Sequence, residues 1–397
     1  MNSNDIARFL LLFLPLLAGK AEAGNGLAPE VTDLNAKDVS YEREKNLPYL
    51  EKPFISLAPR DRKDQLPVGT LGEDGGDKKL VLKYARKLAE KSENAKTGKT
   101  DSLLIAYKGK LLFESYFRRG RANYPHYQMS ITKSYTAMAL GRAMQLGYLS
   151  MEDLNKPVLS FLKKLDASKL TKGASKITLH EAMHMSSGIR LPKKKIHQLI
   201  DRPERLLGQG QVQAYLQFSA AISPYPRDYK YQASDPSITM QVLQSVVPSS
   251  AEDFIRDELL KPMGIGNYHW QDDLSGLPKS AAGSSLLSRD MIKMGMLVLD
   301  GGKWKGKQHV PEAFVKKATS PIVQTNEDNW YGYFWWSQNL GIDGMKYPVI
   351  QGRGAGGQFI FTFPTLELVV VATAHNKGMG TMLRALPQQL IPAFNTK

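Results

Sequence analysis

The order of hydrophobic and polar positions along the chain predicts strands near both ends and helices between them. Residues 77–92 place apolar side chains at the 3.6-residue spacing of an amphipathic helix. Residues 102–117 indicate two strands joined by a turn at Lys108-Gly109-Lys110. Mainly helical signals follow over residues 130–299, and the clearest helix is KSYTAMALGRAMQLGYL at residues 133–149.

Strand patterns return from residue 330, where WYGYFWWSQ is aromatic and strand-like. Residues 358–363 and 366–374 are apolar strands separated by Pro364, and the last segment, 378–394, is helical in pattern. The predicted fold class is α/β of the α+β type. An antiparallel sheet built from both chain ends is flanked by N- and C-terminal helices, with a mainly helical lobe inserted.

The N-terminus has the form of a secretory signal peptide. Arg8 precedes a ten-residue apolar run, and Ala21-Glu22-Ala23 is a small-x-small cleavage site, so we expect residues 1–23 to be removed. An uncleaved anchor is the alternative, although the apolar run is short for a bilayer. Residues 24–76 are rich in Pro, Gly, Asp and Lys, and we expect an extended arm.

The remaining 77–397 then form one domain. Its sheet lobe would comprise residues 77–129 and 300–397, and its helical lobe residues 130–299. The 397-residue length is enough for two lobes with a sizeable core.

Composition narrows the chemistry and the partners. The chain has no cysteine, which excludes disulfides, thiolate metal sites and cysteine nucleophiles. Its net charge of +15 favours anionic surfaces or substrates. An exported chain seldom meets nucleic acid, so we predict no nucleic-acid partner and keep the anionic surface of a cell envelope as a candidate. The expected location is outside the cytoplasm of a bacterium, periplasmic or secreted.

Residues 180–184, HEAMH, match the H-E-x-x-H pattern of zinc hydrolases, with Glu204 as a candidate third ligand. The local sequence favours another interpretation. Thr178 and Glu181 have the T-x-x-E spacing of a capping box, and Ser186-Ser187-Gly188 ends the helix soon afterwards. The glutamate is then occupied by the cap, and His180 and His184 are ordinary helix residues, so we predict no metal site here.

Residues 352–357 match the dinucleotide pattern G-x-G-x-x-G. That pattern must open a helix to bind a pyrophosphate, whereas here it precedes the strand at 358–363. We therefore predict no dinucleotide cofactor, and no other cofactor.

Ser130 and Lys133 lie three residues apart at the start of the long apolar helix. Positions i and i+3 share a helix face, so the Lys133 amine can reach the Ser130 hydroxyl and act as its base when burial lowers the lysine pKa. S-x-x-K is a weak signal alone. It recurs at Ser160 and Lys163, which we interpret as a surface coincidence, and Ser130 could be a simple N-cap.

The context of Ser130 decides between these interpretations. The chain resembles the serine β-lactamase and penicillin-binding-protein superfamily, nearest the class C-like esterases and the nylon-oligomer (aminohexanoate) hydrolases. The resemblance covers roughly residues 77–395. It rests on segments in the family's order: SITKSYTAMALGRAMQLGYLSMEDLNKPVLSFL, ITLHEAMHMSSGI, AISPYPRDYKYQASD, LLKPMGIGNYHW, AAGSSLLSRDMIKMGMLVLDGGKWKGK, YGYFWW and GRGAGGQFIFTFPTLELVVVATA.

This resemblance implies roles for three residues. Ser130 would be the acylating nucleophile and Lys133 its base or proton relay. Tyr231 matches the tyrosine of the family's Y-x-N element, where a tyrosinate near an ammonium group can shuttle protons. The asparagine of that element is Ala233 here, so an amide that would grip a β-lactam or a peptide is missing.

The third family motif, K-T-G or H-x-G, corresponds to Gly352-Arg353-Gly354 or to the overlapping GAGGQ, with Arg353 as the only cation. By this resemblance the second oxyanion N–H comes from Gly357 or Gln358. Tyr229 is either a substrate-lining residue or an aromatic packed on the core. Trp335 and Trp336 are expected in the core or the cleft wall.

The predicted function is an exported serine hydrolase that cleaves a small ester or amide through a Ser130 acyl-enzyme, with Lys133 and Tyr231 transferring protons. β-Lactams and D-amino-acid peptides stay open as substrates, although both motif departures favour an esterase or amidase. The first alternative is a non-catalytic envelope protein of the same fold that binds cell-wall or lipid fragments. A zinc hydrolase is the second.

Overall fold

The computed structural model describes residues 27–34, 39–90, 99–192, 194–195, 199, 201–342 and 344–395. The expected signal peptide, residues 1–23, lies outside this part of the chain. Within it, no helix is both long enough and apolar enough to cross a membrane.

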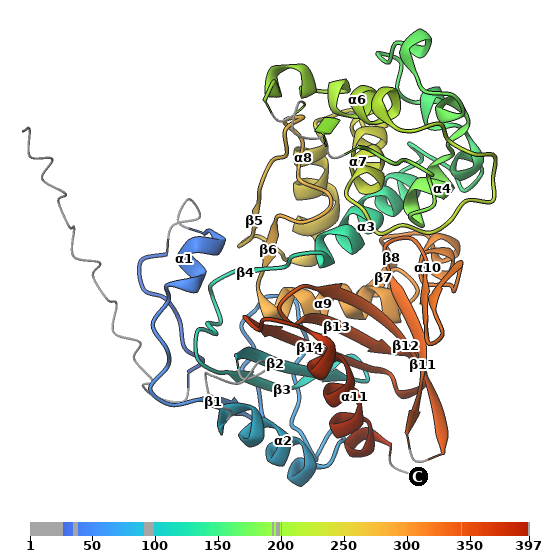
Figure 1. Ribbon diagram of the computed structural model, residues 1–397. Coiled ribbons are helices and arrows are strands. Elements are labelled where there is room, and N and C mark those ends of the chain that lie inside the picture. The colour runs from blue at the N-terminus through green and yellow to red at the C-terminus, as the bar shows by residue number, and fades with distance from the viewer. Residues whose placement is uncertain are drawn as a thin grey trace, which may run out of the picture.

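A nine-stranded antiparallel sheet forms the lower half of the molecule (Figure 1). Its central pair joins the two chain ends, because β2 from the N-terminal side pairs with β14 from the C-terminal side. The prediction of one sheet built from both ends is confirmed. In spatial order the strands are β1 (Phe54–Ser56), β3 (Lys110–Tyr116), β2 (Thr100–Tyr107), β14 (Leu368–Ala374), β13 (Gln358–Phe363), β12 (Met345–Gly354), β11 (Trp336–Ile342), β10 (Asn329–Tyr331) and β9 (Val323–Asn326).

Helices cover both faces of this sheet. On one face α2 (Lys78–Glu90) packs against α11 (Gly380–Phe394), and both contribute to one apolar core with the strands. On the other face lies α9 (Ser288–Leu299), which contacts β13, β14 and β2. The sequence pattern placed α9 in the helical lobe. In the structure α9 packs on the sheet, because Gly295 allows the helix to approach β14 closely. A Cβ at position 295 would collide with Val369 of that strand.

The helical lobe is built around α3 (Ile131–Gln145), which contacts α7 (Ser234–Val246) and β12. Nearly every residue of α3 is buried, in keeping with its run of small and apolar side chains. Gly141 meets Phe314 at close range. The other helices are α4 (Leu179–Met183), α6 (Gly210–Phe218), α8 (Ala251–Phe254), continued by a π-helical turn at Ile255–Leu260, and α10 (Glu312–Ala318).

Short strands connect the two lobes. β4 (His126–Tyr127), β6 (Ser284–Leu286) and β5 (His269–Trp270) form a three-stranded sheet, and β7 (Lys303–Trp304) pairs with β8 (Lys307–Gln308). The strand-like segment at 330–338 divides into β10 and β11, because Gly332 to Trp335 form a turn.

The described part of the N-terminal arm lies against the sheet lobe. Its strand β1 pairs with β3, with Phe54 opposite Tyr116. Its short helix α1 (Tyr41–Lys45) begins at an N-cap, Ser40, and buries Glu44. The Arg121 guanidinium donates to the carbonyl of Pro48, which fixes the segment between these two elements.

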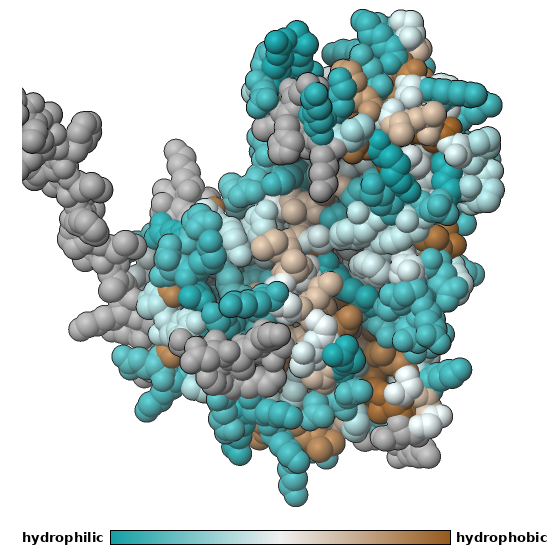
Figure 2. Space-filling view, viewed as in Figure 1, coloured by the Kyte–Doolittle hydropathy of each residue, from teal (hydrophilic) through white to brown (hydrophobic). Residues whose placement is uncertain are grey.

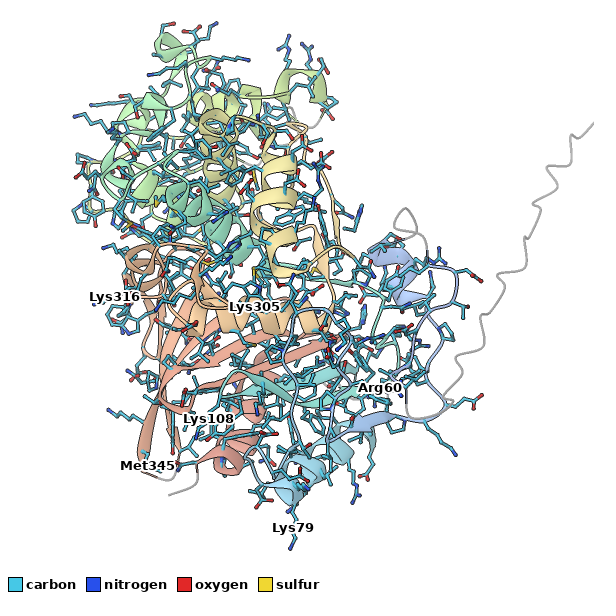
Figure 3. All side chains as sticks on the ribbon, turned by 180° about the vertical axis from the view of Figure 1, so that it is seen from behind. Arg60, Lys79, Lys108, Lys305, Lys316 and Met345 are labelled. Atoms are coloured by element: carbon cyan, nitrogen blue, oxygen red, sulfur yellow. The ribbon has the colours of Figure 1, made fainter. Side chains whose placement is uncertain are left out.

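The surface is mainly hydrophilic, with hydrophobic residues in small groups on the face that Figure 2 shows. The positive charge is spread over the sheet lobe. The five exposed cations labelled in Figure 3 come from separate elements and project outward. They are Arg60, Lys79, Lys108, Lys305 and Lys316.

Candidate active site

Ser130 stands where β4 turns into α3. Met129, just before it, has a φ of 49°, a left-handed conformation that bulky residues rarely adopt. Buried Gln128 supports this turn, since its side-chain amide donates to the His126 carbonyl and its oxygen accepts from the Tyr135 hydroxyl. Ser130 is therefore held partly exposed just before the first turn of α3.

Lys133 lies one turn further along α3, and its Nζ is 3.1 Å from the Ser130 Oγ. The same Nζ donates to the carbonyl of Ala281 at 2.6 Å. The lysine is only 4% exposed, and no carboxylate in the described part of the chain pairs with it. Burial therefore lowers the Lys133 pKa to about 7. Near neutral pH much of this amine is uncharged and can accept a proton.

Tyr231, in the loop before α7, completes this group. Its hydroxyl bonds to Ser130, and the Lys133 Nζ lies 4.6 Å from the centroid of its ring. Although 41% of the residue is exposed, burial of its hydroxyl end raises the Tyr231 pKa, which the Ser130 bond and the charge of Arg353 only partly offset. The tyrosine thus favours its phenol form, in contrast to the expected tyrosinate.

Arg353, near the end of β12, is buried beside the same group. Its Nε donates to Gln351 at 2.6 Å, and one terminal nitrogen donates to Asn329 at 2.7 Å and Gln338 at 2.9 Å. Its guanidinium carbon lies 4.7 Å from the Trp336 ring centroid. Burial lowers the Arg353 pKa to about 10, so the side chain remains charged at neutral pH.

Aromatic rings form one wall next to Tyr231. Tyr229 and Tyr331 have centroids 5.4 Å apart, and Trp336 packs 5.9 Å from Tyr231 and 4.8 Å from Tyr331. Tyr229 is thus packed on other rings. Its hydroxyl is also buried and has no hydrogen-bond partner among the described residues, and burial raises its pKa. Trp335, by contrast, is fully buried in the core.

Gly357 and Gln358 face away from Ser130. The Gly357 N–H donates to the Gly354 carbonyl at 3.3 Å within the β12–β13 turn. The Gln358 side chain bonds to both the N–H and the carbonyl of Ala374 on β14. The Gly357 N–H is thus engaged within the turn, and the oxyanion roles expected for Gly357 and Gln358 stay predictions.

Ala355, which was not among the residues that the sequence indicated, lies near the turn of Ser130. A Cβ on Gly354 would collide with the Gln128 carbonyl, so the end of β12 passes directly beside the turn that carries Ser130. Ala355 comes next and is exposed. In the parts of the chain that the structure describes, neither its N–H nor that of Ser130 donates a hydrogen bond. The register of the third motif, with Arg353 at its centre, indicates this residue.

The capping box at Thr178 is confirmed. The Glu181 N–H donates to the Thr178 hydroxyl at 3.2 Å, and the Glu181 carboxylate accepts from the Thr178 N–H at 2.7 Å. The same carboxylate forms a buried ion pair with Arg227. His180 bonds through its Nδ1 to Tyr333, and burial lowers the His184 pKa to about 4.

Asp235 is a buried carboxyl that the sequence interpretation overlooked. It accepts hydrogen bonds from Gln232 and Ser234, and Gln232 reaches on to Ser187. Burial raises the Asp235 pKa to about 6. This network ties the Tyr231 loop to the turn that ends α4, so the HEAMHMSSG segment supports the site from a distance.

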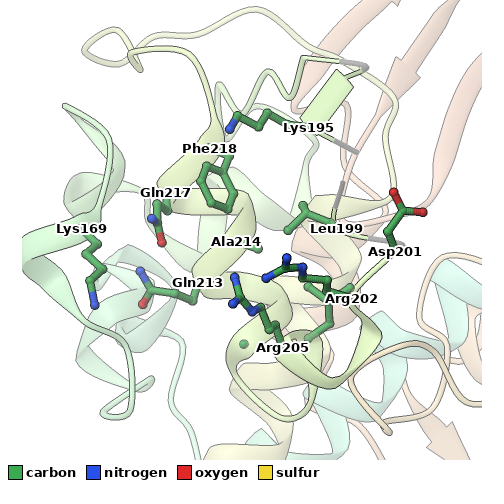
Figure 4. Close-up of a pocket in the computed structure, with 12 residues that line it drawn as sticks. Lys169, Lys195, Leu199, Asp201, Arg202, Arg205, Gln213, Ala214, Gln217 and Phe218 are labelled. Carbon is green, nitrogen blue, oxygen red and sulfur yellow. The ribbon is translucent and has the colours of Figure 1, made fainter. Parts of the chain in front are cut away.

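Two cavities differ in their relation to Ser130. A cavity of about 790 Å³ lies in the helical lobe, and Figure 4 shows Lys169, Arg202 and Arg205 around it. No residue of the group around Ser130 lines it. A second cavity, of about 350 Å³, includes Met129 and Ala355 and therefore adjoins the serine.

A partly exposed serine beside a buried lysine, between an antiparallel sheet and a helical lobe, is an arrangement that suits a serine hydrolase. The Beta-lactamase family model matches residues 88–390, and the chain belongs to this family. No functionally curated protein matches the chain significantly in sequence.

Solved structures share the fold at low identity. A protein from Bacillus anthracis assigned as a 6-aminohexanoate-dimer hydrolase is 18% identical, covers 88% of this chain and 91% of its own, and has a TM-score of 0.61. EstCE1, described as a hydrolase with promiscuous acyltransferase activity, is 13% identical with coverages of 80% and 99% and a TM-score of 0.61. A class C β-lactamase is 14% identical with coverages of 80% and 95% and a TM-score of 0.61.

Proposed function

We propose that this protein is an exported serine hydrolase that cleaves an ester or amide through an acyl-enzyme on Ser130. The observation that carries the proposal is the contact between Lys133 and Ser130, 3.1 Å apart. The lysine has no carboxylate partner in the described structure, and its pKa is about 7. A serine oxygen needs a nearby neutral base, and this amine fits that need.

In the acylation step the Ser130 Oγ attacks the substrate carbonyl carbon, and its proton passes to the Lys133 amine. Tyr231 is in its phenol form and therefore holds a proton that it can donate to the departing alcohol or amine. The Lys133 ammonium then returns a proton to the phenolate. A water molecule hydrolyses the acyl-enzyme by the same groups in reverse, releasing the acid and restoring Ser130.

The tetrahedral intermediate needs donors for its oxyanion. We assign this role to the N–H groups of Ser130 and Ala355, which donate to no other described residue. The positive end of α3 adds to the stabilisation of negative charge. Arg353 supplies the one fixed cation on the opposite side of the site, in the place of the family's lysine or histidine.

The substrate class follows from what borders the serine. The partly exposed rings of Tyr229 and Trp336 suit an apolar or aromatic group, and Ala233 offers no amide to hold a β-lactam or peptide side chain. A simple ester or amide therefore fits better than a β-lactam. The similar structures include one assigned as a 6-aminohexanoate-dimer hydrolase and one described as a hydrolase with promiscuous acyltransferase activity, which agrees with this substrate class.

Export rests on the sequence of residues 1–23. N-terminal sequencing of the protein secreted by a bacterial host should give Gly24 as the first residue. An unprocessed chain retained in the cytoplasm would contradict this part of the proposal.

The nucleophile is tested with a fluorophosphonate probe. We expect the parent protein to be labelled and Ser130→Ala to be unlabelled. Ser160→Ala removes the serine of the second S-x-x-K sequence and is the matched control, which should label like the parent. Equal labelling of Ser130→Ala and the parent would refute the proposal.

The substrate is tested with four compounds: a short-chain nitrophenyl ester, a chromogenic cephalosporin, a D-Ala-D-Ala peptide and an aminohexanoate dimer. We expect turnover of the ester or the dimer that is abolished in Ser130→Ala. Absence of turnover with all four, together with retained binding of cell-wall or lipid fragments, would favour the non-catalytic envelope protein instead.

A further inference from the structure

Three segments that are far apart in the sequence meet behind the turn that carries Ser130. They contribute Glu44 from α1, His126 from β4 and His375 directly after β14. One ligand-type atom from each side chain lies within 4.8 Å of the others. All three are deeply buried, with 3% exposure for Glu44, 6% for His126 and 9% for the His375 side chain.

The contacts among these three side chains leave one polar atom without a partner. Glu44 pairs with the His126 Nδ1 through Oε1 and accepts from the Tyr127 N–H at 3.0 Å through Oε2. The His375 Nε2 points toward the same Oε1 but stands 3.8 Å away. It is buried and has no hydrogen bond in the described structure. Buried imidazole nitrogens are rarely left unsatisfied, so this atom indicates a missing partner.

The outer contact of His375 matches that of a metal ligand. The His375 Nδ1 bonds to the buried Asp101 carboxylate at 2.6 Å, which aims Nε2 at the centre of the cluster. Histidines that bind metals almost always have such a partner on the nitrogen that does not bind.

Buried carboxylates supply negative charge at the cluster, whereas four cations, Lys45, Lys99, Arg119 and Lys377, line the adjoining cavity. Glu44 and Asp101 bring two buried carboxylates, which a divalent ion bound to neutral histidines would neutralise. The cavity of about 350 Å³ that adjoins Ser130 is lined by His375 and Gln358, so the cluster has an access path from solvent. Access is a requirement for any metal site that fills after folding.

We propose that Glu44, His126 and His375 form a binding site for a divalent transition metal, best matched by Zn²⁺. Two imidazole nitrogens and one carboxylate oxygen are a common zinc ligand set, at about 2.0–2.2 Å from the ion. In a tetrahedral site such ligands stand roughly 3.4 Å apart, so the three atoms need only small movements. The fourth position is open toward the cavity and takes water.

Such an ion ties the N-terminal arm to the domain. Glu44 belongs to the arm, whereas His126 belongs to strand β4 of the domain and His375 directly follows strand β14. His126 also precedes Ser130 by four positions, so the same ion would stiffen the turn that presents the serine. The site is distinct from the HEAMH sequence, whose histidines lie in the helical lobe.

The test uses the full chain, purified without a histidine tag and stripped with EDTA. After incubation with ZnSO₄ and desalting, elemental analysis should find one zinc per chain. X-ray absorption of the parent protein should show two imidazole ligands, which needs no variant to fold. Limited proteolysis should cut the segment around α1 more slowly in the zinc-loaded than in the EDTA-treated protein.

Variants assign the ligands by competition with a chromophoric chelator. His126→Asn and His375→Asn should abolish tight binding, and Asp101→Asn should weaken it by about 10–100-fold. His180→Asn is the matched control, because it removes a partly buried histidine from the other lobe and should bind zinc like the parent. A parent that retains no zinc, an absorption spectrum without imidazole, or unchanged affinity in His375→Asn would each overturn the proposal.

Discussion

Lys133→Met should make the protein more stable while abolishing its activity. The native state buries an amine whose pKa falls from 10.5 to about 7, because it loses water and gains no counter-charge. Methionine fills a similar volume without a charge. The buried ammonium thus destabilises the native state, and the substitution removes that cost together with the base.

The size and the sign of this cost follow from linkage. Between pH 7 and 10.5 the unfolded chain still holds the proton that folded Lys133 has released, so the parent gains stability as the pH rises. Well below pH 7 the buried Lys133 ammonium lowers the free energy of unfolding by about 5 kcal/mol. This cost is still about 5 kcal/mol at pH 6 and falls to about 2 kcal/mol at pH 9. The stability advantage of Lys133→Met should therefore shrink by about 3 kcal/mol over this interval.

Urea unfolding of both proteins at pH 6 and pH 9 measures this change, and taking the difference between the two pH values cancels any packing effect of methionine. Lys163→Met is the control, since it removes the exposed lysine of the second S-x-x-K sequence. Its stability relative to the parent should not depend on pH. An advantage of Lys133→Met that is constant or grows with pH would refute the assignment of an uncompensated, buried lysine.

Three other outcomes test the site and its support. The rate of acylation by a nitrophenyl ester should rise with pH through an apparent pKa near 7, that of Lys133, and a flat profile from pH 5 to 9 would contradict its role as base. Tyr231→Phe should lower kcat for an amide by about 10²–10⁴-fold, and a loss confined to KM would instead indicate a binding role. Glu181→Ala should cost about 3–5 kcal/mol of folding stability, because it leaves Arg227 buried without its partner, and a calorimetric melting temperature within 1 °C of the parent would contradict that pairing.

The sequence was sufficient for elements whose signal is local. The period of 3.6 placed α2 and α3, the Lys108-Gly109 turn placed the β2–β3 hairpin, and the T-x-x-E spacing identified the capping box at α4. In each case the interacting groups lie within a few residues of one another. The side of the sheet on which α9 packs could not be predicted this way, because it depends on the fit of Gly295 against a distant strand.

In the candidate site, too, the contacts between residues close in sequence could be predicted, and those between distant residues could not. Ser130 and Lys133 share one helix turn, so their contact follows from spacing. The register of the oxyanion donor did not follow from the sequence, because GRGAGGQ contains four glycines and the contact of Gly354 with the turn before Ser130 involves a distant segment. Glu44 and His375 are more than 300 positions apart, and no pattern in the sequence brings them together.

Other buried cations in the described chain show what sets Lys133 apart. Lys293 is completely buried and pairs with Asp290 at 2.7 Å, and Arg289 pairs with Glu114 at 2.9 Å. In both cases a carboxylate balances the charge, which is the usual condition for burying it. Lys133 instead donates to a backbone carbonyl and to a serine hydroxyl. A carboxylate beside Lys133 would stabilise the fold but would hold the amine in its charged form. The unpaired lysine therefore costs stability for the same physical reason that it can take the proton of Ser130.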